Sequence, residues 1–389
     1  MMKEYRRIVF SALLLLALLA AGLAGCGTAA PAAESPSEAT EAVRTRTGSM
    51  ELKYARQFSV DYFSDGSTLL TIAGADRFLL LPEGGEAPAG LEDTTVVLRP
   101  PLDRIYVAAS SAMDLFLHLN ALDRVGFTST SYEDWGLGEV REAMDALDLA
   151  YAGKYSAPDF ELLLSEGCSL AVESTMIYHS PDIMEKLQSL GIPVLVERSS
   201  YEPHPLGRVE WIRLYGLLLG RETEAEAFFR QQEEKLAALD TAPAAGQTVA
   251  FFHISSAGAA VVRKPGDYVS RMIELAGGSY VFDSLPGAED SALSTMNMQL
   301  EAFYAGARDA DVLIYNSTID GELNSLDALL QKCSLLADFK AVERGNVWCT
   351  EHDMFQKSSA AAGMIADFNT VLSQGAAAPD QLEFLHRLK

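Results

Sequence analysis

Histidines and cysteines are the side chains of this sequence best suited to metal binding or nucleophilic catalysis. The chain has six histidines: His118, His179, His204, His253, His352 and His386. None stands in an HxH or HxxxH pattern, and no CxxC pair occurs, so the spacing favours neither a zinc ribbon nor a linear metal motif. His179, His253 and His352 lie near the ends of apolar, strand-like runs. A site in which they converge on bare zinc or manganese therefore stays open.

The common catalytic motifs are missing. The sequence contains no G-x-S-x-G, H-E-x-x-H or G-x-x-x-x-G-K-[ST] pattern. We therefore expect no enzyme and no catalytic residues, with a lipid-anchored hydrolase as the alternative of a different class. Cys168 and Cys349 adjoin apolar runs and are expected to be buried thiols, while a Cys333–Cys349 disulfide stays possible.

The amino-acid composition excludes several classes of protein. The 389 residues carry a formal net charge of −24, with 49% apolar and 22% charged residues. This composition is typical of a folded protein with real cores and excludes a wholly disordered chain. The acidic excess argues against binding to nucleic acid and against a polybasic membrane surface, because phosphates would be repelled over most of the chain.

The N-terminus reads as an export signal. Lys3, Arg6 and Arg7 precede an apolar run of 16 residues, which is shorter than the roughly 20 residues of a membrane-spanning helix. The run ends in Leu23-Ala-Gly-Cys26, which resembles the lipobox of bacterial lipoproteins. We expect residues 1–25 to be the signal peptide and Cys26 to carry the lipid, palmitate included. Residues 26–50 are rich in Ala, Pro, Ser and Thr and are expected to form a flexible tether on the outer side of the cell membrane.

Further along, the pattern becomes that of an α/β protein. Three β-type runs fill residues 58–81, and Asp65-Gly66 predicts a hairpin turn between the first two. After them, short apolar strands alternate with amphipathic helices, which predicts two Rossmann-like lobes with mostly parallel sheets. The expected boundaries are 51–221 for the first lobe, 222–240 for a single connecting helix, and 241–389 for the second lobe.

An internal echo relates the two lobes. Phe160-Glu161 and Leu300-Glu301 each begin a helix that leads to an apolar strand followed by Ser-Thr, at Ser174-Thr175 and Ser317-Thr318. In open α/β sheets, ligands bind beyond the carboxyl ends of the strands. The echo therefore places a similar ligand-facing edge on each lobe.

The order of several motifs resembles a known family over nearly the whole chain. They are the lipobox, His204-Pro-Leu-Gly-Arg-Val-Glu-Trp211, Leu217-Leu-Leu-Gly-Arg-Glu-Thr-Glu-Ala225, Tyr268, Leu275-Ala-Gly-Gly278 and Asp309-Ala-Asp-Val-Leu-Ile314. Together they look like the substrate-binding lipoproteins of bacterial ABC importers that capture iron–siderophore complexes, haem and cobalamin. The resemblance implies two lobes bridged by one rigid helix, with the ligand held in the cleft between them. It also implies partnership with an ABC permease and its ATPase, and a monomeric receptor.

In that family, one exposed Glu on each lobe docks on arginines of the permease. By motif position these residues are Glu161 and Glu301. Acidic side chains suit this role because they give register and a fast association rate at a basic partner.

The resemblance further implies a cleft lined by loops at strand ends. Aromatic rings offer flat area to a large chelate, hydroxyls orient it, and Lys154 and Arg263 suit an anionic siderophore or porphyrin. The expected ligand is a ferric chelate of siderophore type, with haem or cobalamin as alternatives, and no resident cofactor. The candidate ligand-binding residues are Ser110, Trp135, Lys154, Tyr155, Thr175, Tyr178, Tyr201, Ser256, Arg263, Tyr268, Ser317, His352 and Phe355.

Overall fold

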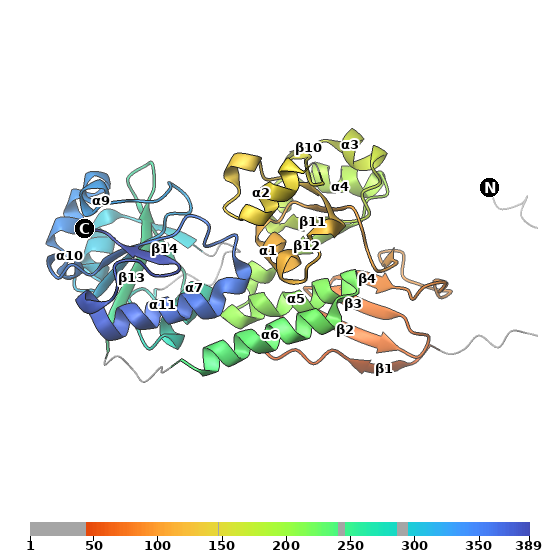
Figure 1. Cartoon of the computed structure of the whole chain (residues 1–389), viewed down its shortest axis with the longest axis horizontal. Helices are drawn as coiled ribbons and strands as arrows, with labels where there is room; N and C mark the ends of the chain where they lie inside the picture. Colours follow the sequence, from red (N-terminus) through yellow and green to blue (C-terminus); the bar gives the residue numbers. More distant parts are fainter. Residues whose placement is uncertain (1–43, 147, 240–245, 286–294) are drawn as a thin grey trace, which may run out of the picture. The chain divides into compact units, whose positions relative to one another are not determined.

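The structure is a computed structural model that describes residues 44–146, 148–239, 246–285 and 295–389. The expected signal peptide, Cys26 and most of the expected tether lie outside the described residues. The described part is an α/β protein with two largely parallel sheets and one further sheet at its N-terminal end (Figure 1). The predicted fold class is confirmed.

The N-terminal sheet has five strands in sequence order. They are β1 (Arg46–Ser49), β2 (Phe58–Phe63), β3 (Thr68–Ile72), β4 (Asp76–Leu80) and β5 (Val96–Leu98), antiparallel except for the parallel pair β4–β5. The predicted hairpin at Asp65-Gly66 is confirmed, with Gly66 at a φ of +79°. The tether expected to reach residue 50 is wrong at its end, because β1 already pairs with β2.

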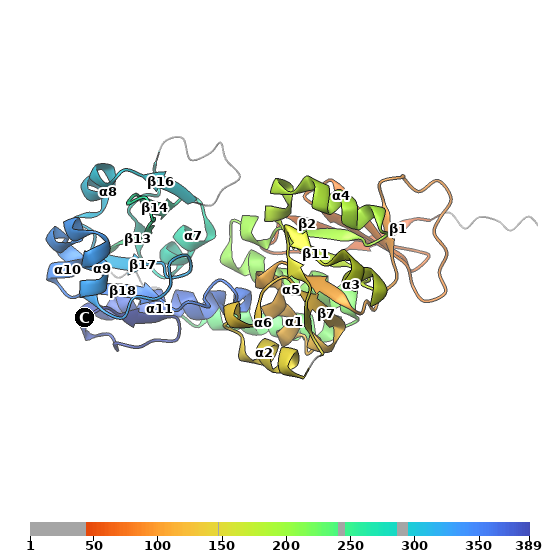
Figure 2. The same ribbon diagram turned by 90° about the horizontal axis from the view of Figure 1, so that it is seen from above.

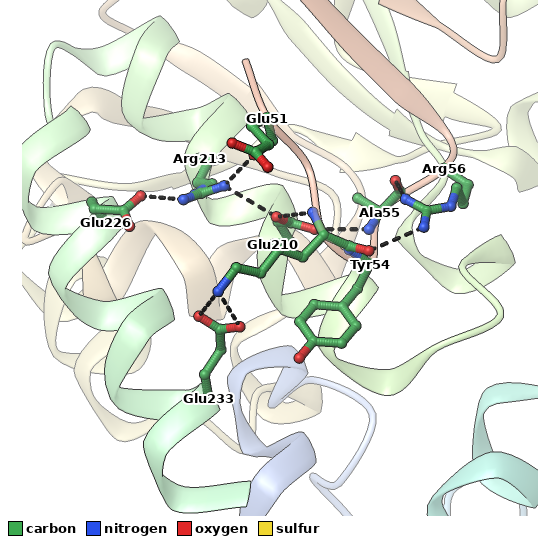
Figure 3. A network of polar contacts seen from close by, with 9 residues as sticks. Glu51, Tyr54, Ala55, Arg56, Glu210, Arg213, Glu226 and Glu233 are labelled. Carbon is green, nitrogen blue, oxygen red and sulfur yellow. Dashed lines mark hydrogen bonds and ion pairs between the residues drawn. The ribbon is translucent and has the colours of Figure 1, made fainter. Parts of the chain in front are cut away.

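Two buried carboxylates, Glu210 and Glu202, fix the chain between β1 and β2, and Figure 3 shows the contacts of Glu210. Glu210 accepts hydrogen bonds of 2.8–3.0 Å from the backbone N–H groups of residues 53–55, and Arg213 donates to it at 3.1 Å. Glu202 accepts hydrogen bonds from the backbone N–H groups of residues 56 and 57, at 2.7 and 2.9 Å. It also accepts a hydrogen bond from the indole N–H of Trp211. The N-terminal sheet is thereby attached to the first lobe through charge-assisted hydrogen bonds.

The first lobe is built on a fully parallel sheet of order β12-β11-β6-β7-β8. Alternate residues face two cores: Tyr106 and Ala171 face α3 and α4, whereas Val107 and Val172 face α1 and α5. Its strands are β6 (Ile105–Val107), β7 (Val125–Thr128), β8 (Ala150–Tyr151), β11 (Ala171–Ser174) and β12 (Val194–Glu197), and β9 (Gly153–Lys154) pairs with β10 (Ala157–Pro158) beside them. Its helices are α1 (Ser110–His118), α2 (Gly138–Asp145), α3 (Phe160–Ser165) and α4 (Pro181–Ser189).

Two adjacent helices lead out of the first lobe. α5 (Pro205–Leu219) is buried on nearly all sides, and α6 (Glu222–Ala237) packs along it, as Figure 1 shows in green. The helices approach closely at Gly216, where a Cβ atom would lie 2.7 Å from that of Ala225. The next described strand after α6 is β13 of the second lobe, and the predicted domain boundaries stay a prediction.

The second lobe contains a mixed sheet of order β16-β14-β13-β17-β18-β19, with β15 beside β13. Figures 1 and 2 both show α9 and α10 on one side of this sheet and α7 on the other. Its strands are β13 (Thr248–Ile254), β14 (Ala260–Arg263), β15 (Ser279–Tyr280), β16 (Thr295–Met298), β17 (Val312–Tyr315), β18 (Val347–Thr350) and β19 (Leu385–Arg387). Its helices are α7 (Tyr268–Leu275), α8 (Leu300–Ala307), α9 (Leu326–Lys332), α10 (Lys340–Glu343) and α11 (Ala361–Gln374).

Candidate functional site

The loop that follows β18 carries the second lobe onto the first. Gln356 accepts a hydrogen bond from the Gly136 N–H at 2.8 Å and donates to the Asp134 carbonyl at 2.8 Å. Ser359 donates its backbone N–H to Asp114 at 2.7 Å, and its hydroxyl lies 2.8 Å from Nε2 of His118. These contacts bring the strand-end loops of both lobes together.

Three predicted ligand residues meet at this junction. The Arg263 guanidinium lies 4.8 Å from the ring centre of Phe355 and 5.5 Å from that of Tyr268. The two rings meet edge to face, with centroids 6.4 Å apart. Arg263 and Tyr268 are buried, and Phe355 is half-buried. Strand β14 positions the cation, the first turn of α7 positions Tyr268, and the loop after β18 positions Phe355.

A second cation reaches the same place from the first lobe. Arg208 of α5 lies 4.1 Å above the Tyr268 ring and donates to the Ser358 hydroxyl at 3.4 Å, while its Nε has no hydrogen-bond partner among the described residues. We call Arg208, Arg263, Asp267, Tyr268 and Phe355 the junction cluster. The sequence analysis missed Arg208 because it lies within an apolar helix, where a charged residue normally marks the solvent side. The sequence did carry a signal: α5 is apolar on all its faces and so has no solvent side on which Arg208 could lie.

Buried carboxylates accompany the two cations. Asp267 lies 3.7 Å from Arg263 and caps the N-terminus of α7 through the Val269 N–H. Burial raises the pKa of Asp267, and the Arg263 charge opposes that rise. Burial also raises the pKa of Glu197, against which Ser199 hydrogen bonds and the Arg208 charge act. Each arginine therefore has a buried carboxylate near it, Asp267 beside Arg263 and Glu197 near Arg208.

The wall beside Arg208 is deformable. A small cavity there is lined by Tyr268 and Phe355, by the loop residues Lys357 and Ser358, and by Met272, Met354 and Met364. Unbranched thioether side chains fill irregular space and rearrange easily. The junction can therefore change its shape around an incoming group.

Apolar side chains are exposed where first-lobe strands end. Tyr151 is 43% exposed at the end of β8, and Met176 and Tyr178 are 47% and 46% exposed just after β11. On the second lobe, Ile319 is 67% exposed shortly after β17. Exposed apolar area at strand ends is suited to a large, partly apolar ligand.

The other predicted ligand residues divide by accessibility. Trp135 is buried in the core and Ser317 is fully buried against the Thr350 hydroxyl, so neither side chain is open to a cleft in this structure. The accessible first-lobe candidates are Ser110, Lys154, Tyr155, Thr175, Tyr178 and Tyr201, and those of the second lobe are Ser256 and His352. None of these accessible residues belongs to the junction cluster, and their ligand roles remain predictions.

A family model for periplasmic binding proteins matches residues 106–353, which is more than half of the chain. The chain belongs to the periplasmic binding protein family. The matched range begins after the N-terminal sheet and contains four members of the junction cluster, whereas Phe355, α11 and β19 lie just beyond its end. The family predicted from the motifs is therefore confirmed, and its members are solute-binding proteins.

The relatives agree with this family. An uncharacterized lipoprotein of Methanocaldococcus jannaschii is 23% identical over 332 residues, covering 78% of this chain and 77% of its own. The periplasmic haem-binding protein of Vibrio cholerae has a TM-score of 0.55 at 20% identity, over 69% of this chain and 98% of its own. An Fe³⁺-hydroxamate transport protein of Saccharomonospora viridis has a TM-score of 0.51 at 16% identity, over 68% and 92%. At these identities the solved structures establish the fold shared with this binding protein.

The two predicted docking residues occupy equivalent places. Glu161 is the second residue of α3 and Glu301 the second of α8, and each helix leads to a parallel strand, β11 or β17. Both side chains are exposed, and neither forms an ion pair among the described residues. The similarity between the two lobes is thus present in the structure as well as in the sequence. Docking of these residues on a permease remains a prediction.

The remaining predictions concern metals, thiols and the membrane. Within residues 44–389, apart from the short undescribed gaps, no three His, Cys, Asp or Glu residues gather as a metal-binding group. Cys333 and Cys349 are both free thiols, so the disulfide left open above does not form here. No helix in the described ranges is long and apolar enough to cross a membrane. The lipid on Cys26 lies outside those ranges.

Proposed function

We propose that this periplasmic binding protein is the lipid-anchored, extracytoplasmic receptor of an ABC importer, capturing an anionic ferric chelate of siderophore type. It delivers the chelate to the permease, whose ATPase drives import, and leaves it chemically unchanged. The observation that carries the proposal is the junction cluster. It holds two buried guanidinium groups, one from each lobe, on the faces of Tyr268 and Phe355.

Each part of the cluster fits such a ligand. Guanidinium groups bind oxygen anions through paired, charge-assisted hydrogen bonds, and aromatic faces stack on flat ligand groups. Arg208 has an unused Nε donor, and the methionines beside it allow the wall to move. Because the two arginines come from different lobes, a ligand that binds both also joins the lobes.

Haem is the second candidate. Its propionates would use the same arginines, and Tyr178, exposed beside β11, is a possible iron ligand. The haem-binding and hydroxamate-transport neighbours together support iron complexes as the ligand class. Cobalamin carries mostly neutral amide side chains, so two buried cations would contribute less to its binding.

A titration of the purified full chain tests the proposal. Ferric hydroxamate, ferric catecholate, haemin and cyanocobalamin are added in turn, and quenching of tryptophan fluorescence is followed. We expect one ferric chelate to bind tightly, and Arg208→Gln to weaken it at least about tenfold, as is usual for the loss of a charged hydrogen bond. Arg230→Gln, an exposed arginine on α6, is the matched control and should bind normally.

Two outcomes would overturn the proposal. One is a chain that responds only to zinc or manganese. The other is an Arg208→Gln variant that binds the chelate as tightly as the unmodified protein does.

A further inference from the structure

A second cavity, of about 900 Å³, opens where both lobes meet α6. We call it the hinge groove. Its walls are the end of α1 and the start of α2 on the first lobe, one side of α6, and residues 357–363 and 383–384 of the second lobe. A cavity of this size is large enough for a small organic ligand.

The hinge groove is separate from the proposed chelate site. It is lined by none of the thirteen residues predicted to bind the chelate, nor by any member of the junction cluster. Lys357 and Ala360 nevertheless line both the groove and the cavity beside Arg208. The segment that contains them is a common wall between the two sites.

A buried polar group without a partner lies in the groove wall. The Gln232 side chain, on the buried side of α6, is 4% exposed and forms no hydrogen bond among the described residues. Its amide atoms are not among the fully enclosed side-chain atoms that lack a partner in the described residues, so they keep some exposure toward the groove that Gln232 lines. The amide of Gln232 therefore has both donors and an acceptor to offer to a ligand in the groove.

Exposed charged side chains of both signs line the same groove. Glu139 and Glu383 have no cationic partner in the described part of the chain, and Lys235 has no acidic one. Apolar contact area is present as well, because the Phe228 ring stacks on His118 with centroids 4.3 Å apart. The groove thus combines anionic, cationic, amide and aromatic groups.

We propose that the hinge groove binds a small zwitterion: an amino acid or short peptide. Its amine forms an ion pair with Glu139 or Glu383, and its carboxylate forms one with Lys235. Its peptide or carboxylate oxygens accept hydrogen bonds from the Gln232 amide. A dianion would have no favourable partner for the two glutamates, and a dication would have none for Lys235. Because the groove is formed by both lobes and α6, a bound zwitterion holds these three parts together.

Isothermal titration of the purified full chain tests this site directly. The probes are leucine, leucyl-glycine and leucyl-glycyl-glycine, with glutarate and 1,5-diaminopentane as dianion and dication. We expect at least one zwitterion to bind at least about tenfold more tightly than either control compound. Gln232→Leu should weaken that binding about tenfold or more, whereas Gln188→Leu, at an exposed position on α4, should leave it unchanged.

The variants are first compared for thermal stability without ligand. If Gln232→Leu does not fold, Lys235→Gln replaces it, with the exposed Arg230→Gln of the same helix as its control. The proposal is overturned if no zwitterion binds the full chain, if glutarate or the diamine binds equally well, or if the groove variant binds as the control does.

Discussion

At the scale of single residues, the junction cluster shows which of its members could be predicted from the sequence. Arg263, Tyr268 and Phe355 were predicted because each lies near the end of a strand, where parallel sheets present their ligands. Arg208 was missed because its guanidinium emerges from a buried helix, and only the packing of α5 shows where it points. Trp135 has the right chemistry at a strand end but turns into the core.

Glu173 gives the protein a pH-dependent stability. It is fully buried on β11, and neither carboxylate oxygen has a hydrogen-bond partner among the described residues. Burial raises its pKa from 4.5 to about 8. The folded chain therefore binds more protons than the unfolded chain between these values, and the free energy of unfolding falls as pH rises through this window. The expected loss is on the order of 3–5 kcal/mol.

Chemical denaturation of the unmodified protein and of Glu173→Gln, at pH values between 4.5 and 9, measures this contribution. The variant should lose most of the fall in stability. Glu185→Gln, an exposed glutamate on α4, should keep it. Equal pH dependence in all three proteins would show that Glu173 ionises at an ordinary pH in the folded state.

At the scale of elements, the sequence predicted the helices, strands and turns whose positions depend on residues close together in the chain. The strand–helix alternation and the Asp65-Gly66 hairpin were readable from the sequence, since their signals lie within a few residues. β14 and β19 were not: β14 forms a hairpin with β13 that the sequence analysis missed, and β19 obtains its place from β18, which lies far earlier in the chain. The contact between the N-terminal sheet and α5 is equally non-local, joining residues about 155 positions apart.

Glu210 is expected to be the main attachment of the N-terminal sheet. Glu210→Ala leaves three backbone N–H groups without their buried acceptor and removes one of the partners of Arg213, which keeps Glu226 and the Glu51 carbonyl. We expect the free energy of unfolding to fall by about 3–5 kcal/mol, the range for breaking a buried charge network. Urea denaturation measures it, together with limited proteolysis between β1 and β2.

Glu234→Ala on α6 is the matched control. Its ion pair with Arg230 is exposed, so its loss should cost less than about 1 kcal/mol. A similar small loss in Glu210→Ala would mean that Glu202 and the apolar face of the sheet suffice to hold it.

At the scale of the whole molecule, the order of motifs predicted the family, and the structure added how the lobes touch. That contact depends on Gly136, where a Cβ atom would lie 2.2 Å from the Cβ of Asp353 across the junction. No local sequence signal distinguishes this glycine from Gly138 two residues later, whose Cβ position has nothing within 4 Å. The difference arises only when the second lobe is in place.

Gly136→Ala should therefore hold the lobes apart. The clash with Asp353 breaks the hydrogen bond from Gly136 to Gln356, and we expect chelate affinity to fall about tenfold. Small-angle scattering should show a larger radius of gyration for this variant. Gly138→Ala should match the unmodified protein in both measurements, and the same result for Gly136→Ala would show that this contact does not govern closure.

Docking on the permease is tested in cells. Glu161→Ala combined with Glu301→Ala should abolish uptake of the chelate while leaving its binding to the purified protein unchanged. A pair of alanines at Glu185 and Glu234, also exposed, serves as the control. Uptake that survives the first pair would remove the docking role.

The identity of the captured ligand is the central claim, and one spectrum tests it most directly. The protein is purified from membranes of its native host, grown under iron limitation, and its absorbance is recorded from 300 to 700 nm with no ligand added. A ferric siderophore gives a broad charge-transfer band in the visible range, which is the predicted result. A Soret band, a corrin spectrum, or a colourless protein stabilised only by zinc or manganese would contradict it.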